Sequence, residues 1–294
     1  MRINEQQTVS DLLYSLGQDN QSINKLQQQI ATGQVVNSPS DNPALNQQLM
    51  LLQEQLDQNN VYTQNSNYAS SFLSQQSSAL SNAVNVMTSV KTMLLSSAND
   101  SNPQDQQNYA TQLGQYISQL LDVANTQYDG KYIFGGSQTT TQPFFMNASQ
   151  TAVSTNPAGV DGALRLDVSN QVSQQYNITG AEAFNNGQMF NDLITIKNEL
   201  NSGAAASQSD ITTVENYLNS MINTNAEAGA MSNRFSLIQN QLSSQSQTLQ
   251  STMSNLGDTD VASAVIQLQE QQTSLDAALK TGAGIIQMSL AQYL

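Results

Sequence analysis

Apolar side chains at the start of the sequence recur every three or four residues, in the heptad order of coiled-coil helices. The positions are Val9, Leu12, Leu16, Ile23, Leu26 and Ile30, and Asp19 is the one polar residue in the series. A period of seven kept over three repeats predicts a helix that pairs with another along a narrow apolar seam. An ordinary amphipathic helix that faces its own core is the alternative.

A short segment rich in Gly, Ser, Asn and Pro interrupts the helical pattern at residues 30–44. Gly33 is expected to end the first helix, and Pro39 restricts the residue before it to an extended conformation. Pro43 suits the first turn of the next helix, with Ser40, Asp41 or Asn42 as its cap. The predicted interhelix connector consists of Gly33, Ser38, Pro39, Ser40, Asp41 and Pro43.

Helical periodicity then continues over most of the chain. One long helix is predicted from Pro43 to about residue 97, with a polar stretch in its middle, and a third helix follows Pro103. The pattern returns at 190–200 and again at 214–253. The last segment carries its own apolar series, which we expect to complete an assembly seam with the first helix: Val261, Val265, Leu268, Leu275, Leu279, Ile286 and Leu290.

The segment after residue 125 has a different pattern. Gly-containing turn pairs surround a short run of Tyr, Ile and Phe, and Leu164, Leu166 and Val168 alternate with charged residues. Alternation between turn signals is typical of strands. Residues 132–184 are therefore predicted to form a small β-rich insertion.

The order of these elements is nearly symmetric about the insertion, so the two ends can bury their seams together only if the chain folds back on itself. The predicted fold class is mainly α, a long antiparallel helical hairpin or coiled-coil rod formed by the N- and C-terminal halves, with the β-rich insertion at its tip. We expect a terminal coiled-coil domain (1–42 with 257–294), a helical rod domain (43–131 with 185–256) and the surface insertion (132–184).

Composition excludes several functional classes. The net charge is −14, and the eight basic residues form no cluster, so neither nucleic acid nor an anionic membrane is an expected partner. The chain has no His or Cys and no phosphate-binding glycine motif, so we expect no enzyme, metal or cofactor. The Asp258-Thr259-Asp260 motif is interpreted as a helix cap rather than a metal site.

Neither a membrane-spanning run nor a signal-like N-terminus is evident in the sequence. If the protein leaves the cell, we expect it to do so without a cleaved signal peptide.

Several short motifs recur in a fixed order along the chain. They are residues 29–33 with 38–43, residues 125–126, 130–136 and 143–144, residues 225–230 with 233–234, and residues 258–262 with 289–294. Each motif alone is weak, but their order and spacing resemble the flagellin superfamily of bacterial flagellar axial proteins. Asn42 stands where that family usually has Asp, and Gln34-Val35 where it usually has Lys-Arg.

The resemblance implies an extracellular structural subunit, exported unfolded through the flagellum's own channel. The motif at 132–136 and the Tyr293-Leu294 ending are more typical of the junction between hook and filament than of the filament subunit. Implied partners are other copies of the chain in a ring, the adjacent hook-associated protein on the hook side, flagellin and a cytoplasmic export chaperone. The alternatives are flagellin itself or a needle-tip or translocator coiled-coil protein of a related secretion system. An enzyme carried in the insertion is a third, disfavoured interpretation.

A physical hypothesis accompanies this interpretation. Two short helices that meet along one seam bury little area, whereas ordering each residue costs about 1–2 kcal/mol of backbone entropy. We therefore expect the terminal helices to form the inner layer of a tube and to become fully ordered only when neighbouring subunits pack around them.

Overall fold

The computed structural model describes residues 2–291, with the side chains of Gln7 and residues 9–284. Seven α-helices are described: α1 (Arg2–Thr32), α2 (Pro43–Ala98), α3 (Pro103–Ala124), α4 (Gly180–Phe184), α5 (Gln188–Asn201), α6 (Gln208–Gly257) and α7 (Val261–Ala291). The chain divides into two compact units, which are residues 1–58 with 245–294 and residues 59–244. Helices α2 and α6 each contribute to both units.

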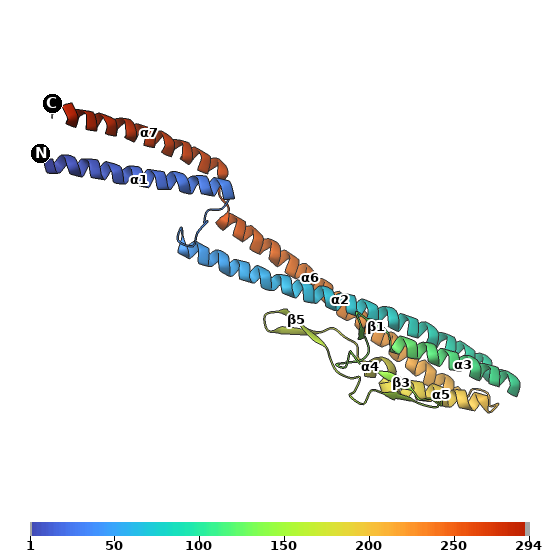
Figure 1. The fold of residues 1–294 in the computed structure, drawn as a ribbon. Coiled ribbons are helices and arrows are strands. Elements are labelled where there is room, and N and C mark those ends of the chain that lie inside the picture. The colour runs from blue at the N-terminus through green and yellow to red at the C-terminus, as the bar shows by residue number, and fades with distance from the viewer. Residues whose placement is uncertain (1, 292–294) are drawn as a thin grey trace. The chain divides into compact units, whose positions relative to one another are not determined.

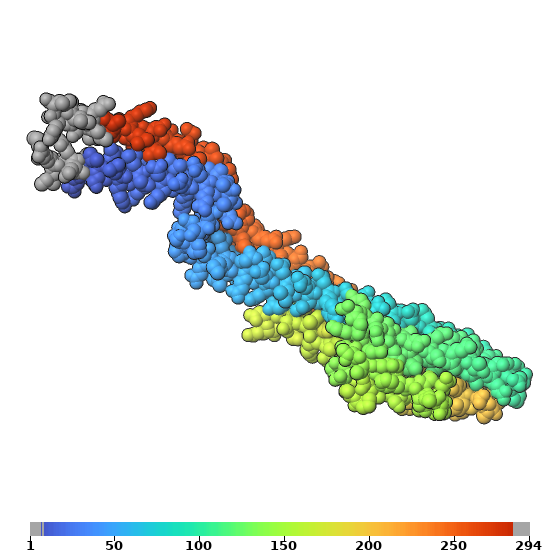
Figure 2. Space-filling model, in the orientation of Figure 1, coloured from blue at the N-terminus to red at the C-terminus, as the bar shows by residue number. Residues whose placement is uncertain are grey.

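The first unit joins the two ends of the sequence. Helices α1 and α7 lie side by side in opposite directions, and the space-filling view shows their atoms packed together (Figures 1 and 2). The remainder of this unit is the first part of α2 and the last part of α6. The helix pair formed by residues distant in sequence is the arrangement that the two heptad series predicted.

The second unit holds one continuous hydrophobic core, built by α2, α3, α5, α6 and the segment between α3 and α5. Leu80, Met87 and Leu94 of α2 are fully buried in it. Four phenylalanine rings gather in the core with centroids 5.1–5.7 Å apart, namely Phe134, Phe144, Phe184 and Phe190. Two of these ring pairs, Phe134–Phe184 and Phe144–Phe184, are edge-to-face, and such packing adds to the free energy that burial alone provides.

The strands form three separate antiparallel hairpins rather than one sheet. The strands are β1 (Gln127–Tyr128) with β2 (Lys131–Tyr132), β3 (Phe144–Met146) with β4 (Val153–Thr155), and β5 (Arg165–Ser169) with β6 (Val172–Gln175). A two-stranded hairpin is at best marginally stable alone. Other contacts must therefore hold these hairpins in place.

Side-chain amides of the buried Gln76 and the half-buried Asn125 supply those contacts. The Gln76 amide donates to the carbonyls of Ile133 (2.6 Å) and Ile178 (2.7 Å), and its oxygen accepts from the Ile178 amide (2.8 Å). Asn125 pairs in the same two-way manner with the backbone of Phe144, at 3.0 and 3.1 Å. Each amide acts as a short piece of strand, because it offers one donor and one acceptor side by side.

The end of the second unit where α2 leads into α3 and α5 leads into α6 is formed by the turns between these helices, and not by the strands. The Ala206 amide after α5 donates to the Ser97 hydroxyl of α2 at 3.1 Å, and a Cβ on Gly203 would lie 3.2 Å from Cβ of Pro103. On α2, Gln76 holds residues 133 and 178, and Asn65 donates to the carbonyl of Asp167 in β5 (2.9 Å). The β3–β4 hairpin is held instead by Asn125 after α3 and by Asn191 of α5.

The predicted fold class, mainly α with paired long helices and a small strand-containing insertion, is confirmed. The insertion differs from expectation in its place beside the helices and in its content. Residues 180–184 form α4, which a Thr179–Glu182 capping box starts. A five-residue helix followed by two left-handed asparagines is too short to show a helical period in the sequence.

Candidate assembly site

The α1 half of the predicted seam faces α7. Ile23 is 8% exposed, and the other five apolar positions of the series are half-buried. Their neighbours on α1 point away, with Leu13 64% exposed and Tyr14 70% exposed. The heptad series therefore identifies the face that contacts α7.

The α7 half of the seam differs from the prediction. Its inward positions follow a spacing of three and four residues through Ala264, Leu268, Gln271, Leu275, Ala278 and Gly282. Leu268 and Leu275 were predicted and lie in the seam. Val261, Val265 and Leu279 were also predicted but lie outside it, 45%, 47% and 50% exposed.

The physical reason for this correction is side-chain size. Ala264, Ala278 and Gly282 occupy contact positions beside Leu268 and Leu275 and let α7 approach α1 closely. Val261, Val265 and Leu279 turn outward. A search for large apolar residues alone places the seam on the wrong phase of the helix. The predicted positions Ile286 and Leu290 lie in α7, but their side chains are outside the described residues.

Two specific contacts cross the seam. The Gln271 side-chain amide donates to the carboxylate of Asp19 at 3.0 Å. Further along, Leu12 packs against Gly282 so closely that a Cβ on the glycine would lie 2.6 Å from Cδ2 of Leu12. Sequence reasoning noted Asp19 as a polar interruption of the heptads but missed its partner, because Gln271 is one of many glutamines.

An apolar surface remains exposed beside the seam. On α7 it consists of Val261, Val265, Ile266 (60% exposed) and Leu279, and on α1 of Leu13 and Tyr14. These side chains make the terminal helix pair apolar on faces that the described chain does not cover. Exposed apolar side chains grouped on one element are typical of protein–protein contact.

The connector after α1 is joined to the connector after α6 by backbone hydrogen bonds. Gly33 has a positive φ of 71°, which ends α1, and its carbonyl accepts from the Thr259 amide at 2.8 Å. The Val35 amide donates to the carbonyl of Gly257 at 2.7 Å, so Gln34 and Asp258 form an antiparallel bridge. The connectors at the two breaks in the helical pattern are thus bonded to each other and form one joint.

Asp41 organises the rest of the connector. Its carboxylate accepts from the backbone amides of Asn37 (3.2 Å) and Ser38 (2.9 Å), and Lys25 lies 4.0 Å away. Residues 38–41 form a turn closed by the Asp41 amide and the Ser38 carbonyl at 2.9 Å, so Ser38-Pro39 begins a turn and not an extended segment. Proline favours the second position of such turns.

The caps of α2 and α7 are now defined. Asn42 caps α2, because its side-chain oxygen accepts from the Leu45 amide at 3.1 Å, and Pro43 is the first residue of the helix. Asp260 caps α7 through the amides of Ala262 (3.1 Å) and Ser263 (3.2 Å), and Asp258 accepts from the Ser254 hydroxyl. Among the described residues, no three acidic side chains come together as metal ligands would.

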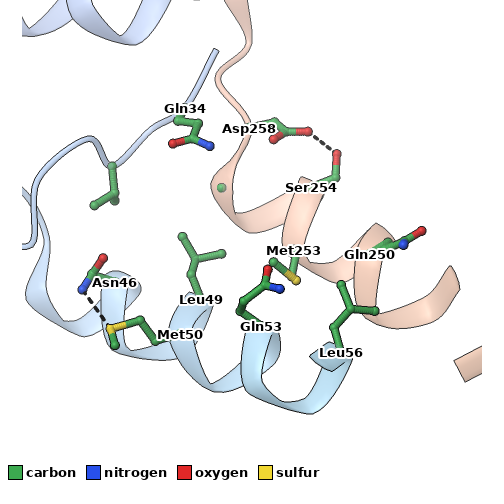
Figure 3. Close-up of a pocket in the computed structure, with 12 residues that line it drawn as sticks. Gln34, Asn46, Leu49, Met50, Gln53, Leu56, Gln250, Met253, Ser254 and Asp258 are labelled. Atoms are coloured by element: carbon green, nitrogen blue, oxygen red, sulfur yellow. Dashed lines mark hydrogen bonds between the residues drawn. The ribbon is translucent and has the colours of Figure 1, made fainter. Parts of the chain in front are cut away.

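A groove of about 460 Å³ lies between the start of α2 and the end of α6, within the first unit (Figure 3). Its apolar lining is Val36, Leu49, Met50, Leu56 and Met253. Gly257 closes one side, where a Cβ would lie 3.3 Å from Leu49.

No helix in the described part of the chain has the length and apolar content to span a membrane.

Comparison with known proteins gives a consistent result. Residues 3–139 match the model of the bacterial flagellin N-terminal helical region, and residues 211–294 match that of the bacterial flagellin C-terminal helical region. The chain is 26% identical to flagellar hook-associated protein 3 of Salmonella typhimurium, over 99% of each chain.

Solved structures show the same fold. Flagellar hook-associated protein 3 from Legionella pneumophila aligns with 70% of this chain and 98% of its own, at a TM-score of 0.63 and 16% identity. The flagellar junction protein FlgL from the same organism aligns with 65% of this chain and 99% of its own, at a TM-score of 0.55 and 17% identity.

The chain belongs to the flagellin superfamily, and its two terminal helical regions pair here as α1 and α7. Within that class it matches hook-associated protein 3, the protein also called FlgL, along 99% of its length. The expected structural role in the flagellum is confirmed, and neither the filament subunit nor a translocator is favoured.

Proposed function

We propose that this chain forms the junction layer that links the hook side of the bacterial flagellum to the flagellin filament, outside the cell. The observation that carries the proposal is the match along 99% of the chain to hook-associated protein 3. Copies of the chain would form a ring, with the adjacent hook-associated protein on one side and flagellin on the other. The 132–136 motif supports a junction rather than a filament role.

The exposed apolar side chains of α1 and α7 support assembly through the terminal helices. The inward seam is only half-buried at most positions, whereas Leu80, Met87 and Leu94 in the second unit are fully buried. Val265, Ile266 and Leu279 gain burial only if another subunit covers them. Neighbouring subunits would thereby complete a core that one chain leaves unfinished.

We further propose that the terminal helices become fully ordered on assembly. Hydrogen exchange measures this directly, because an unpaired helix exchanges its amides quickly and a packed helix slowly. Residues 9–30 and 264–282 should exchange fast in the isolated chain and slowly in the assembled layer. Slow exchange in both states would contradict ordering on assembly while leaving the junction role intact.

A junction must also stop after one layer, although head-to-tail contacts normally propagate. Surfaces that meet unlike partners should therefore fit poorly between stacked copies of this chain. Purified protein alone is expected to form rings or remain monomeric. Growth of long homopolymers would contradict the junction role and favour that of a filament subunit.

Export and escort belong to the same proposal. The chain would pass unfolded through the flagellar channel without a cleaved signal peptide, accompanied in the cytoplasm by an export chaperone. Its role would be structural and not enzymatic, as in the structural flagellar proteins it resembles.

Deletion of the coding sequence tests the central claim. A strain that lacks the chain should carry intact hooks without filaments and shed flagellin into the medium, and the intact coding sequence should restore filaments. Normal filaments in the deletion strain would overturn the proposed function. Loss of the hooks themselves would place the protein at an earlier step and would also contradict it.

A further inference from the structure

We propose that Asp19 with Gln271, and Leu12 with Gly282, fix the register in which α1 pairs with α7. This register is a property of the single chain and does not depend on the junction role. A seam of leucine and isoleucine repeated every seven residues can also pair after a slip of seven residues with its apolar contacts largely kept.

The polar pair distinguishes the observed register from the slipped ones. Gln271 donates to Asp19 at 3.0 Å, and both residues occupy inward, half-buried positions. Among the inward positions whose side chains are described, residues 9–30 of α1 hold one acidic residue, Asp19, and residues 264–282 of α7 hold one glutamine, Gln271. Each therefore has one suitable partner across the seam.

A slip of seven residues in either direction separates this pair. Asp19 would then stand opposite Ala264 or Ala278, and Gln271 opposite Leu12 or Leu26. Both polar groups would lose a hydrogen-bond partner at half-buried positions, which is costly for a carboxylate in particular. The observed register is the one in which neither group is left without its partner.

The glycine contact adds a steric criterion. Gly282 is buried, and it accepts Leu12 so closely that a single added carbon would lie 2.6 Å from Cδ2. A slip toward the start of α7 would place Leu12 beside Leu275, a position already filled by a side chain as large as its own. Shape therefore disfavours the slip toward the start of α7, which the polar pair disfavours independently.

Disulfide trapping can test the register, because the chain has no cysteine of its own. From the Asp19–Gln271 pair, one step along each helix places Leu16 opposite Leu275. Leu16→Cys with Leu275→Cys reports the observed register, and Leu16→Cys with Leu268→Cys reports the slipped one. Oxidation of the purified full-length protein traps even a minor paired population, so the test does not depend on assembly.

In the otherwise unchanged chain, the first reporter should form an intramolecular disulfide at least ten times faster than the second. Adding Asp19→Leu with Gln271→Leu should raise the rate of the slipped reporter several-fold. Asp11→Leu with Gln272→Leu is the matched control, since both residues are exposed on the same helices, and it should keep the original preference. Asp19→Asn should also keep it, because an amide oxygen still accepts from Gln271.

Equal rates of the two reporters in the unchanged chain would overturn the proposal. An unchanged slipped rate after Asp19→Leu with Gln271→Leu would overturn the role of the polar pair. Helix content by circular dichroism, measured for each variant, shows whether the helices are formed when the disulfides are trapped. A strain with a failed junction but a normal reporter preference would separate the failure of the proposed function from that of this inference.

Discussion

Individual side-chain amides hold the short hairpins of this protein in place, a role that neighbouring strands fill in a larger sheet. Gln76, fully buried on α2, makes three hydrogen bonds to the backbone at residues 133 and 178. Asn191 pairs with the Val153 backbone at 2.9 and 3.1 Å, and Asn177 with the backbone at 162 and 164. Asparagine and glutamine thus hold the short hairpins and their connecting segments in place without placing a charge in the core.

Gln76→Ala should lower the free energy of unfolding by about 2–4 kcal/mol, because a buried backbone group without a partner costs about 1–3 kcal/mol. Urea denaturation followed by circular dichroism measures the change. Gln64→Ala, at an exposed position on the same helix, should stay within about 0.5 kcal/mol of the unchanged chain. Equal midpoints for the two variants would contradict the attachment role.

The raised pKa values of two tyrosines predict that the protein loses stability at high pH. Burial raises the pKa of Tyr176 above its usual 10.0, and burial with the hydrogen bond to Asp192 (2.6 Å) raises the pKa of Tyr217. The unfolded chain ionises these hydroxyls first, so the folded state binds more protons above pH 10. Their contribution to stability is complete below pH 10 and is lost as the pH rises through the folded-state pKa.

Chemical denaturation at pH 9, 10 and 11 tests this expectation. The fall in unfolding free energy above pH 10 should be smaller in Tyr176→Phe and Tyr217→Phe, because phenylalanine cannot ionise. Tyr14→Phe is the control, since that side chain is 70% exposed. The same slope in all the variants would show that other groups cause the loss.

At the scale of the element, the two terminal helices differ in how well the sequence reveals their contacts. The α1 face is predictable because leucine and isoleucine occupy it in strict heptads. The α7 face is less predictable, because alanine and glycine fill contact positions beside Leu268 and Leu275 while Val265, Ile266 and Leu279 point outward. A close approach between helices selects small residues at such positions, and the spacing of large residues alone then places the seam partly on the wrong face.

Helix caps show a similar limit. The sequence offered three candidates before Pro43, and only geometry identifies Asn42. At the start of α6, the residue types of Ser207, Ser209 and Asp210 all suit a cap. The helix starts at Gln208 after Ser207, which exchanges hydrogen bonds with Asp210 at 2.7 and 3.2 Å. Several polar residues in a row can each cap a helix, so the pattern places the boundary only to within a few residues.

The two glycines of α7 give a matched test of the seam. Alanine raises helix propensity by about 1 kcal/mol over glycine at either position. At Gly284, where nothing lies within 4 Å of an added Cβ, the full gain should appear as greater helix content. At Gly282 the Cβ must displace Leu12, so the gain should be reduced or reversed. Equal gains by circular dichroism would show that the described contact is absent in solution.

For the whole molecule, the exposed apolar surface predicts a separation between folding and assembly. Val265→Ser with Ile266→Ser changes two exposed side chains, so the unfolding free energy of the isolated chain should stay within about 0.5 kcal/mol. In a strain that depends on this copy, filaments should be lost or much reduced. Gln269→Ser with Gln272→Ser, also exposed on α7, should leave filaments unchanged. Normal filaments with the first variant would exclude this surface from assembly.

The bridged connectors have a consequence for load in a rotating appendage. The connector after α1 and the connector after α6 are joined by two backbone hydrogen bonds at the place where both leave their helices. Torque that reaches this joint is therefore shared between two covalent paths, and neither connector can rotate without moving the other. A subunit built in this way can transmit twist through a flexible-looking sequence without that sequence acting as a swivel.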